Sequence, residues 1–218
     1  MLASPEPTTT WRRREAAALA SLEALEAYTT TDAAKRVVRV YRRLLTQNGG
    51  RLPRKIGFDP TEIGRDLANA VLYDVRDPAR VVFRIAGETI KEHFRTNPVG
   101  RCYLEFVPEE RRSHALAAFR ACAETPCAML ARTRQVFASG VWRYCEAVGL
   151  PLLAEDATAP ATHLLFVDTP LAHPSPSDYD TASFQCAHLI ERRFADLGFG
   201  TPNGFVDLVS PDPDGPFA

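Results

Sequence analysis

Residues 127–168 read CAMLARTRQVFASGVWRYCEAVGLPLLAEDATAPATHLLFVD, and this stretch decides the fold class. Two long apolar runs, 127–137 and 141–150, are joined by Ala138-Ser139-Gly140, a short glycine-containing connection typical of a β-hairpin. A third run at 162–168 follows the loop 151–161. In it, His163, Leu165 and Val167 alternate with Leu164 and Phe166. The pattern predicts three consecutive strands, the last with two different faces.

Two shorter β-branched runs, 70–75 and 81–86, lie upstream and are joined by Asp77-Pro78, which predicts a second hairpin. Helical spacing at 87–94 and 108–124 separates the two groups of strands. On the second of these helices Leu116, Phe119 and Ala123 share a face that we expect to point into the core. Two strands, helices and three strands predict an α+β fold with a mainly antiparallel sheet.

The N-terminal part of the chain predicts two helices, 11–28 and 33–46, separated by Thr29-Thr30-Thr31-Asp32 and ended by Asn48-Gly49-Gly50. The second helix is amphipathic. Its apolar stripe consists of Val37, Tyr41, Leu44 and Leu45. Either the following sheet or the same helix of a second protomer must cover this stripe. We expect a homodimer formed through the N-terminal helices.

The C-terminal part predicts a Pro-rich linker at 169–177 and then a helix at 179–197, with a disordered tail at the end. Ala187, Ile190, Phe194 and Leu197 stand at heptad-like spacing on that helix. The expected organisation is therefore an N-terminal helical segment (1–50), a central domain (51–168) and a C-terminal linker, helix and tail (169–218).

The composition is that of a soluble globular protein, with 45% hydrophobic and 24% charged residues and a net charge of -1. Residues 1–55 carry a surplus of six positive charges, which is more simply a solvated helix face than a nucleic-acid site. No apolar run reaches the roughly 18 residues of a membrane span, and no signal peptide is evident. We therefore expect a cytoplasmic protein that contacts neither nucleic acid nor membrane. The five cysteines show no C-x-x-C pair, so we expect buried thiols and no metal site.

Several short motifs carry a resemblance to a known family. They are Leu52-Pro53-Arg54, Phe58-Asp59-Pro60, Phe83-Arg84-Ile85-Ala86-Gly87, Gly100-Arg101, Ser139-Gly140-Val141-Trp142 and Leu150-Pro151-Leu152. Together with the order of elements, they resemble a PAS domain of the short bacterial stand-alone type with an N-terminal helix, over about residues 33–168. The resemblance implies a five-stranded antiparallel sheet, helices on one face around a small cavity, and a sensing or regulatory role.

PAS proteins that bind flavin or haem suggest two cofactors for this chain. Cys102 superficially resembles the thiol of photosensory members, but it directly follows Arg101, one place earlier than that pattern requires. His114 lies on the helix that supplies the iron ligand in haem-binding members, yet its position predicts that it points away from the face of Phe119. His93 is no better placed. We expect neither haem nor flavin.

Catalysis is not expected either, because no paired carboxylates, triad order, G-x-S-x-G or phosphate-binding glycine loop is present, and the Asp168 and His163 pair is more simply structural. If the helices close over the sheet, a ligand pocket is lined by apolar residues with Arg132 or Arg134 as the anchor for an acidic ligand. The candidate lining residues are Ile85, Phe94, Leu104, Phe119, Met129, Arg132, Trp142 and Tyr144. The alternative is that these side chains simply fill the core.

The sequence thus predicts a signalling protein that acts by protein–protein contact through its flanking helices. A small-molecule sensor with a ligand in the cavity is the alternative. Neither the partner nor the ligand is identified by any motif.

Overall fold

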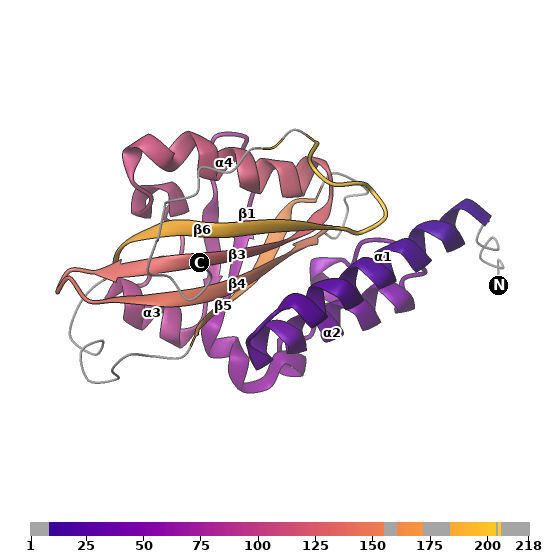
Figure 1. The fold of residues 1–218 in the computed structure, drawn as a ribbon, viewed down its shortest axis with the longest axis horizontal. Coiled ribbons are helices and arrows are strands. Elements are labelled where there is room, and N and C mark those ends of the chain that lie inside the picture. Colours follow the sequence, from indigo (N-terminus) through magenta and orange to yellow (C-terminus); the bar gives the residue numbers. More distant parts are fainter. Residues whose placement is uncertain (1–8, 155–160, 172–183, 204, 206–218) are drawn as a thin grey trace.

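The computed structural model describes residues 9–154, 161–171, 184–203 and 205. Its elements are α1 (Thr9–Tyr28), α2 (Asp32–Gln47), η1 (Lys55–Gly57), η2 (Pro60–Asn69), β1 (Ala70–Asp74), β2 (Val82–Ala86), α3 (Glu88–Phe94), η3 (Tyr103–Phe106), α4 (Glu109–Glu124), β3 (Cys127–Phe137), β4 (Trp142–Leu152), β5 (His163–Pro170) and β6 (Phe184–Asp196). The strands form one antiparallel sheet in the order β2-β1-β5-β4-β3-β6 (Figure 1). The predicted α+β class, with two strands, helices and three strands in that order, is confirmed.

The hairpin of β3 and β4 forms where the sequence predicted it. Gly140, at φ +82°, turns the chain, and its N–H donates to the Phe137 carbonyl over 2.8 Å. Left-handed backbone of this kind favours glycine because a side chain is strained there. The register of the hairpin runs from Val136 opposite Trp142 to Met129 opposite Gly149, so each strand offers alternate residues to the two faces of the sheet.

The C-terminal helix predicted at 179–197 is wrong, because its described part is a strand, β6, that pairs with β3 and makes the sheet six-stranded rather than five-stranded. A bulge explains the error. Arg132 pairs with Glu191 and Thr133 with Leu189, so Ile190 is an extra residue between them. This insertion breaks the two-residue alternation of a strand, and the remaining apolar spacing imitates a helix.

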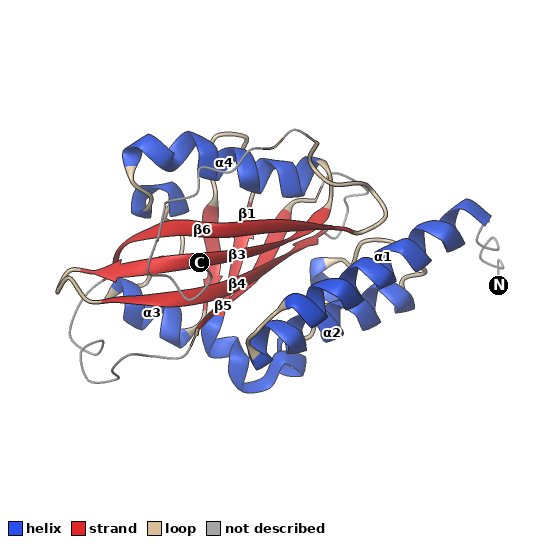
Figure 2. Cartoon of the chain, in the orientation of Figure 1, coloured by secondary structure: helices blue, strands red, loops and turns tan. Residues whose placement is uncertain are grey.

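Helices cover both faces of the sheet rather than one (Figure 2). The helical face is the side on which α1 and α2 pack against Leu130, Val148 and Leu165. The cavity face is the opposite side, where α3, η3 and α4 pack against Met129, Phe166 and their neighbours. The alternation predicted for 162–168 is confirmed, since Leu165 and Val167 belong to the first cluster and Leu164 and Phe166 to the second.

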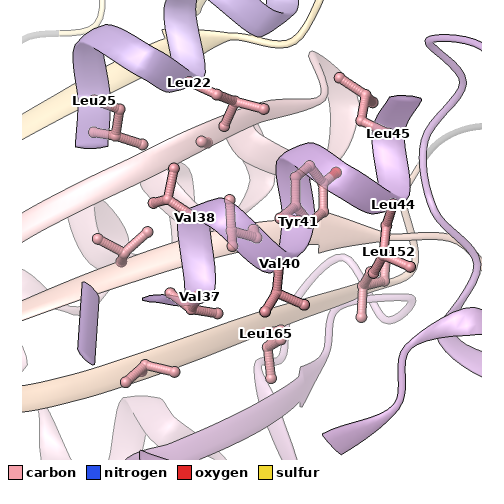
Figure 3. Packing of buried hydrophobic residues seen from close by; sticks show 14 of the residues in the cluster. Leu22, Leu25, Val37, Val38, Val40, Tyr41, Leu44, Leu45, Leu152 and Leu165 are labelled. Atoms are coloured by element: carbon pink, nitrogen blue, oxygen red, sulfur yellow. The ribbon is translucent and has the colours of Figure 1, made fainter. Parts of the chain in front are cut away.

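The apolar stripe of α2 is covered within the same chain. Val37, Tyr41, Leu44 and Leu45 are all buried, and Figure 3 shows them between α1 and the strands that carry Leu152 and Leu165. The Tyr41 hydroxyl donates to the Pro151 carbonyl over 2.7 Å, which fixes the helix on the sheet. The predicted break between the helices is a cap, in which the Thr31 hydroxyl accepts from the N–H of Ala34.

Several predictions lie wholly or partly outside the described residues. Residues 1–8, most of the loop 151–161, most of the linker 169–177 and the tail after 205 are among them. Within the described residues, no helix combines the length and the apolar character needed to cross a bilayer.

Candidate functional site

A cavity of about 130 Å³ lies between the cavity face and the helices that cover it. Its walls combine aliphatic and aromatic side chains, and they come from strands, α3, η3 and α4 alike. The aromatic members are Tyr73, Phe94, Tyr103, Phe119, Phe166 and Phe184. Several of these rings meet edge to face, for example Tyr73 and Phe119 with centroids 5.3 Å apart. Seven polar residues stand among the apolar ones in the described lining, and an apolar wall with some polar groups is the usual composition of a ligand site.

Asp168, at the cavity end of β5, is the one acidic side chain among the described residues that line the cavity. Its Oδ2 accepts a hydrogen bond of 2.7 Å from Gln135 Nε2. Its Oδ1 is buried and has no hydrogen-bond partner among the residues that the structure describes. A buried acceptor without a partner is costly, so this oxygen marks a place where a donor is missing.

Gln135 is held in one orientation by Arg143, which donates to the Gln135 Oε1 from Nε over 3.2 Å and from Nη2 over 3.1 Å. The Gln135 amide therefore presents its N–H to Asp168. Arg143 Nη2 also contacts the His93 ring, 2.9 Å from Nδ1. These four side chains form a continuous polar chain from α3 across β4 and β3 to β5.

The environment shifts the acidity of several groups in and around the cavity. Loss of solvation raises the pKa of Asp168, although Arg143 and the hydrogen bond from Gln135 oppose this. Burial, followed by the positive charge of Arg143, lowers the pKa of His93 from 6.5 to about 3, so this ring is neutral at pH 7. Burial and the Asp168 charge raise the pKa of Tyr103 to about 12. The site therefore combines a carboxyl group, a neutral imidazole and neutral phenols.

The helical face carries the other large group of buried polar side chains. Arg132 donates to Glu146 Oε2 from Nε over 3.2 Å and from Nη2 over 3.0 Å. Glu146 is fully buried, and its Oε1 accepts from the N–H groups of Thr30 and Thr31, each over 2.9 Å. Arg132 also donates to the Tyr28 carbonyl over 3.1 Å. This network attaches the junction between α1 and α2 to the sheet.

Only some of the predicted pocket residues line the cavity. Phe94, Phe119 and Met129 do. Ile85, Leu104, Arg132, Trp142 and Tyr144 do not. Ile85, which is 51% exposed, borders a separate surface hollow, and Trp142 is 39% exposed, so neither side chain lines this cavity. The β3–β4 register explains the errors, because Arg132, Trp142 and Tyr144 point to the opposite face from Met129.

The charged anchor was also predicted on the wrong face. Arg132 forms an ion pair with Glu146, and Arg134 lies two residues further along the same face of β3. The polar groups that do reach the cavity are Gln135, Asp168, His93, His114, Arg111, Thr133 and Arg192. The alternation of side chains along a strand would have identified Asp168 as a cavity residue. It stands two residues after Phe166 and therefore on the same face as Leu164 and Phe166.

His114 lines the cavity together with Ala115 and Phe119, so the prediction that it points away is wrong. The stripe of α4 that reaches the cavity runs through Arg111, Ala115 and Phe119 rather than through Leu116 and Ala123. The Asp168 and His163 pair is not formed either. His163 lies opposite Asp74 at the other end of β5 and borders a separate surface hollow.

The residues that the resemblance suggests for flavin or haem lie in different places relative to the cavity. Cys102 is buried but does not line it, so no thiol faces the space where a flavin adduct would form. Both His93 and His114 reach the cavity, whose 130 Å³ is below the roughly 300–1,000 Å³ of pockets for drug-sized ligands, and the absence of haem and flavin stays a prediction. Among the described residues, no group of three or more His, Cys, Asp or Glu side chains is placed to hold a metal ion.

No protein-family model matches this chain, and no curated protein matches it. Among solved structures, the chain is similar to one described as an RNA-binding Light-Oxygen-Voltage receptor, with 13% sequence identity and a TM-score of 0.37. The alignment covers 74% of this chain and 59% of that receptor chain. A likeness of this degree carries no argument about what the present chain binds, and the fold class stands on the sheet topology itself.

Proposed function

We propose that this protein is a sensory regulatory module in which a small molecule in the cavity changes the packing of α1 and α2, which in turn contact a protein partner. The observation that carries the proposal is the buried Asp168 Oδ1, which has no hydrogen-bond partner among the described residues and lines an aromatic cavity. A native core rarely keeps such a group, and a ligand that supplies the missing donor accounts for it.

The strand β3 offers a short connection between the two faces. Ala131 and Thr133 line the cavity, and Arg132, between them, binds Glu146 and the Tyr28 carbonyl on the helical face. A ligand that displaces β3 therefore acts on the network that holds the α1–α2 junction. A ligand can shift the position of these helices only by as much as its affinity differs between the two arrangements.

The leading prediction from the sequence, protein contact through the flanking helices, becomes the output step of this proposal. Self-association through α1 and α2 remains a prediction, although the α2 stripe that motivated it is covered by the sheet of the same chain. Cytoplasmic location, a regulatory rather than catalytic role, and the lack of nucleic-acid contact also remain predictions.

The test is to fill the cavity and observe the other face. Ala131→Leu places three additional carbons in the cavity without touching Arg132, and Ala117→Leu, on the exposed side of α4, is the matched control. We expect hydrogen–deuterium exchange at the amides of Thr30 and Thr31, which donate to Glu146, to change in Ala131→Leu and not in Ala117→Leu. Unchanged exchange at these amides in a folded Ala131→Leu protein contradicts coupling between the faces.

Native mass spectrometry and an absorption spectrum of freshly purified protein give the complementary measurement. We expect additional mass that is lost on denaturation, and the same spectra report the oligomeric state. A monomer refutes the homodimer without affecting the cavity, whereas a dimer that persists when α1 and α2 carry exposed charge-reversal substitutions places the contact elsewhere.

A further inference from the structure

We infer that the cavity takes a small, uncharged aromatic molecule that donates one hydrogen bond to Asp168 Oδ1, of the phenol type. This inference rests on the proposed function, because it names the class of ligand for the same cavity. It follows from three properties of the lining: the missing donor, the shape and chemistry of the walls, and the charges that surround them.

The missing partner of Asp168 must be a donor. Gln135 Nε2 already donates to Asp168 Oδ2. Arg143 donates to Gln135 Oε1 and so holds the amide in the orientation that directs its N–H to Oδ2 rather than to Oδ1. The remaining lining groups near the carboxyl group do not supply the bond, since Oδ1 has no partner among the described residues. An N–H or O–H group on the ligand satisfies this oxygen, whereas an ether or a hydrocarbon leaves it unsatisfied.

The walls favour one aromatic ring. Tyr73, Phe119 and Phe166 all line the cavity and contact one another with centroids 5.3–5.6 Å apart. The volume of about 130 Å³ is close to the ~150 Å³ of an apolar cavity that holds benzene. A single ring with one or two substituents therefore fills the space, and a fused ring system or a nucleotide does not enter it without a rearrangement.

The surrounding charges oppose a ligand with a net charge of either sign. Arg111 and Arg192 line the cavity, and Arg143 donates to Gln135, so a cationic amine lies near guanidinium groups as well as near Asp168. An anionic ligand brings a second negative charge next to Asp168 in a site where the first one is already desolvated. His93 is neutral and compensates neither charge.

Four single-ring probes of similar size separate these properties: phenol, anisole, benzylamine and benzoate. Binding is measured with protein refolded from denaturant, by isothermal titration and by ¹H–¹⁵N spectra that locate the perturbed residues. We expect phenol to bind in the cavity about tenfold more tightly than anisole, the factor that one net hydrogen bond supplies. Benzylamine and benzoate are expected to bind more weakly than phenol.

Asp168→Asn tests whether the preference depends on the carboxyl oxygen. Its amide N–H takes the place of Oδ1, so the variant offers a donor where the wild type offers an acceptor. We expect the ratio of phenol to anisole affinity to fall to about one. Asp66→Asn is the matched control, because Asp66 is also buried but lies on the helical face beside Arg36, and its phenol preference is expected to remain.

The outcomes separate the inference from the function on which it rests. Equal binding of phenol and anisole, or tighter binding of benzylamine or benzoate, refutes the ligand class and leaves a ligand-binding cavity. Failure of every probe to perturb cavity residues in refolded protein, with Asp168 Oδ1 satisfied only by water, refutes both.

Discussion

The two faces of the sheet bury polar groups in opposite ways. On the helical face the carboxylate of Glu146 is surrounded by donors from Arg132 and from the backbone between α1 and α2. On the cavity face the carboxyl group of Asp168 has one donor and an oxygen without a partner among the described residues. Both faces are built from alternate residues of the same strands, so the difference reflects what packs on them. On the helical face the Glu146 carboxylate is satisfied within the chain, whereas on the cavity face one oxygen of the Asp168 carboxyl group has no partner among the described residues.

The largest expected effect is the loss of the network on the helical face. Glu146→Ala leaves Arg132 buried without its main partner and removes the acceptor of two backbone N–H groups. We expect the free energy of unfolding to fall by about 3–5 kcal/mol in urea denaturation. Glu88→Ala, which breaks the exposed pair with Lys91, is the control and should cost less than about 1 kcal/mol. Equal losses in the two variants would mean that the network contributes no more than a surface ion pair.

Substitutions at two neighbouring residues of β3 compare how tightly the two faces of the sheet are packed. Leu130 is fully buried on the helical face, and Met129 lines the cavity on the other. We expect Leu130→Ala to cost roughly 2–5 kcal/mol and Met129→Ala to cost less, because Met129 already borders empty space and loses fewer contacts. Thermal and urea unfolding of both variants provide the comparison. A larger cost for Met129→Ala implies that the cavity face is the better packed of the two.

Acid should weaken the cavity face through His93. Its pKa is lowered from 6.5 to about 3, so between these values the unfolded chain binds a proton that the folded chain does not. The stabilising contribution of the neutral ring is complete above pH 6.5 and is lost as the pH falls from 6.5 towards 3. His93→Gln, which keeps an acceptor for Arg143, should flatten urea stability curves across this window.

Two further variants check the assignment of that pH dependence. His163→Gln, on the helical face, should remove a smaller part of it, since the pKa of His163 is lowered by burial with partial opposition from Asp74. Asp168→Asn should act in the opposite sense. The raised pKa of Asp168 makes its contribution to stability fall as the pH rises above 3.8, and the variant removes that fall. If His93→Gln leaves the dependence of urea stability on pH unchanged, the acid sensitivity belongs to other groups.

The smallest effect is expected at Trp142. A buried tryptophan in this position would cost roughly 3–5 kcal/mol on truncation to alanine. The structure leaves Trp142 39% exposed at the end of β4, in contact with Tyr144 at a centroid distance of 5.0 Å. We therefore expect Trp142→Ala to cost about 1 kcal/mol, measured by thermal unfolding. A loss of several kcal/mol would indicate that another surface covers this side chain in solution.

The strands of the sheet could be located from the sequence, but their faces could be assigned only in part. β3 begins and ends where its apolar run does, and the alternation in β5 separates Leu164 from Leu165 correctly. β6 was missed because the extra residue Ile190 disrupts the period that identifies a strand. A cavity between the helices and the sheet was predicted, but only Phe94, Phe119 and Met129 of its predicted lining residues line it. Arg132 was chosen for its charge, although its position on β3 excludes it from the face of Met129.

Asp168 illustrates what local sequence does not contain. The sequence predicts that Asp168 shares a face with Phe166. It does not predict that one oxygen of Asp168 lacks a partner, because this depends on where Gln135 and Arg143 place their donors on two other strands. Burial of a carboxyl group is a property of the assembled sheet. A polar residue at the end of an apolar strand is ordinary at the surface and informative only when a neighbouring layer encloses it.

The pairing of β6 with β3 has a consequence for the order in which the molecule assembles. Glu191 of β6 accepts from Arg132 and, over 2.6 Å, from the hydroxyl of Tyr28 at the end of α1, 163 residues earlier in the chain. Closing so long a segment loses much entropy before these contacts compensate for it, so they should form late in folding. During synthesis, α1 and the edge of β3 therefore stay incompletely covered until β6, one of the last described elements, has been synthesised.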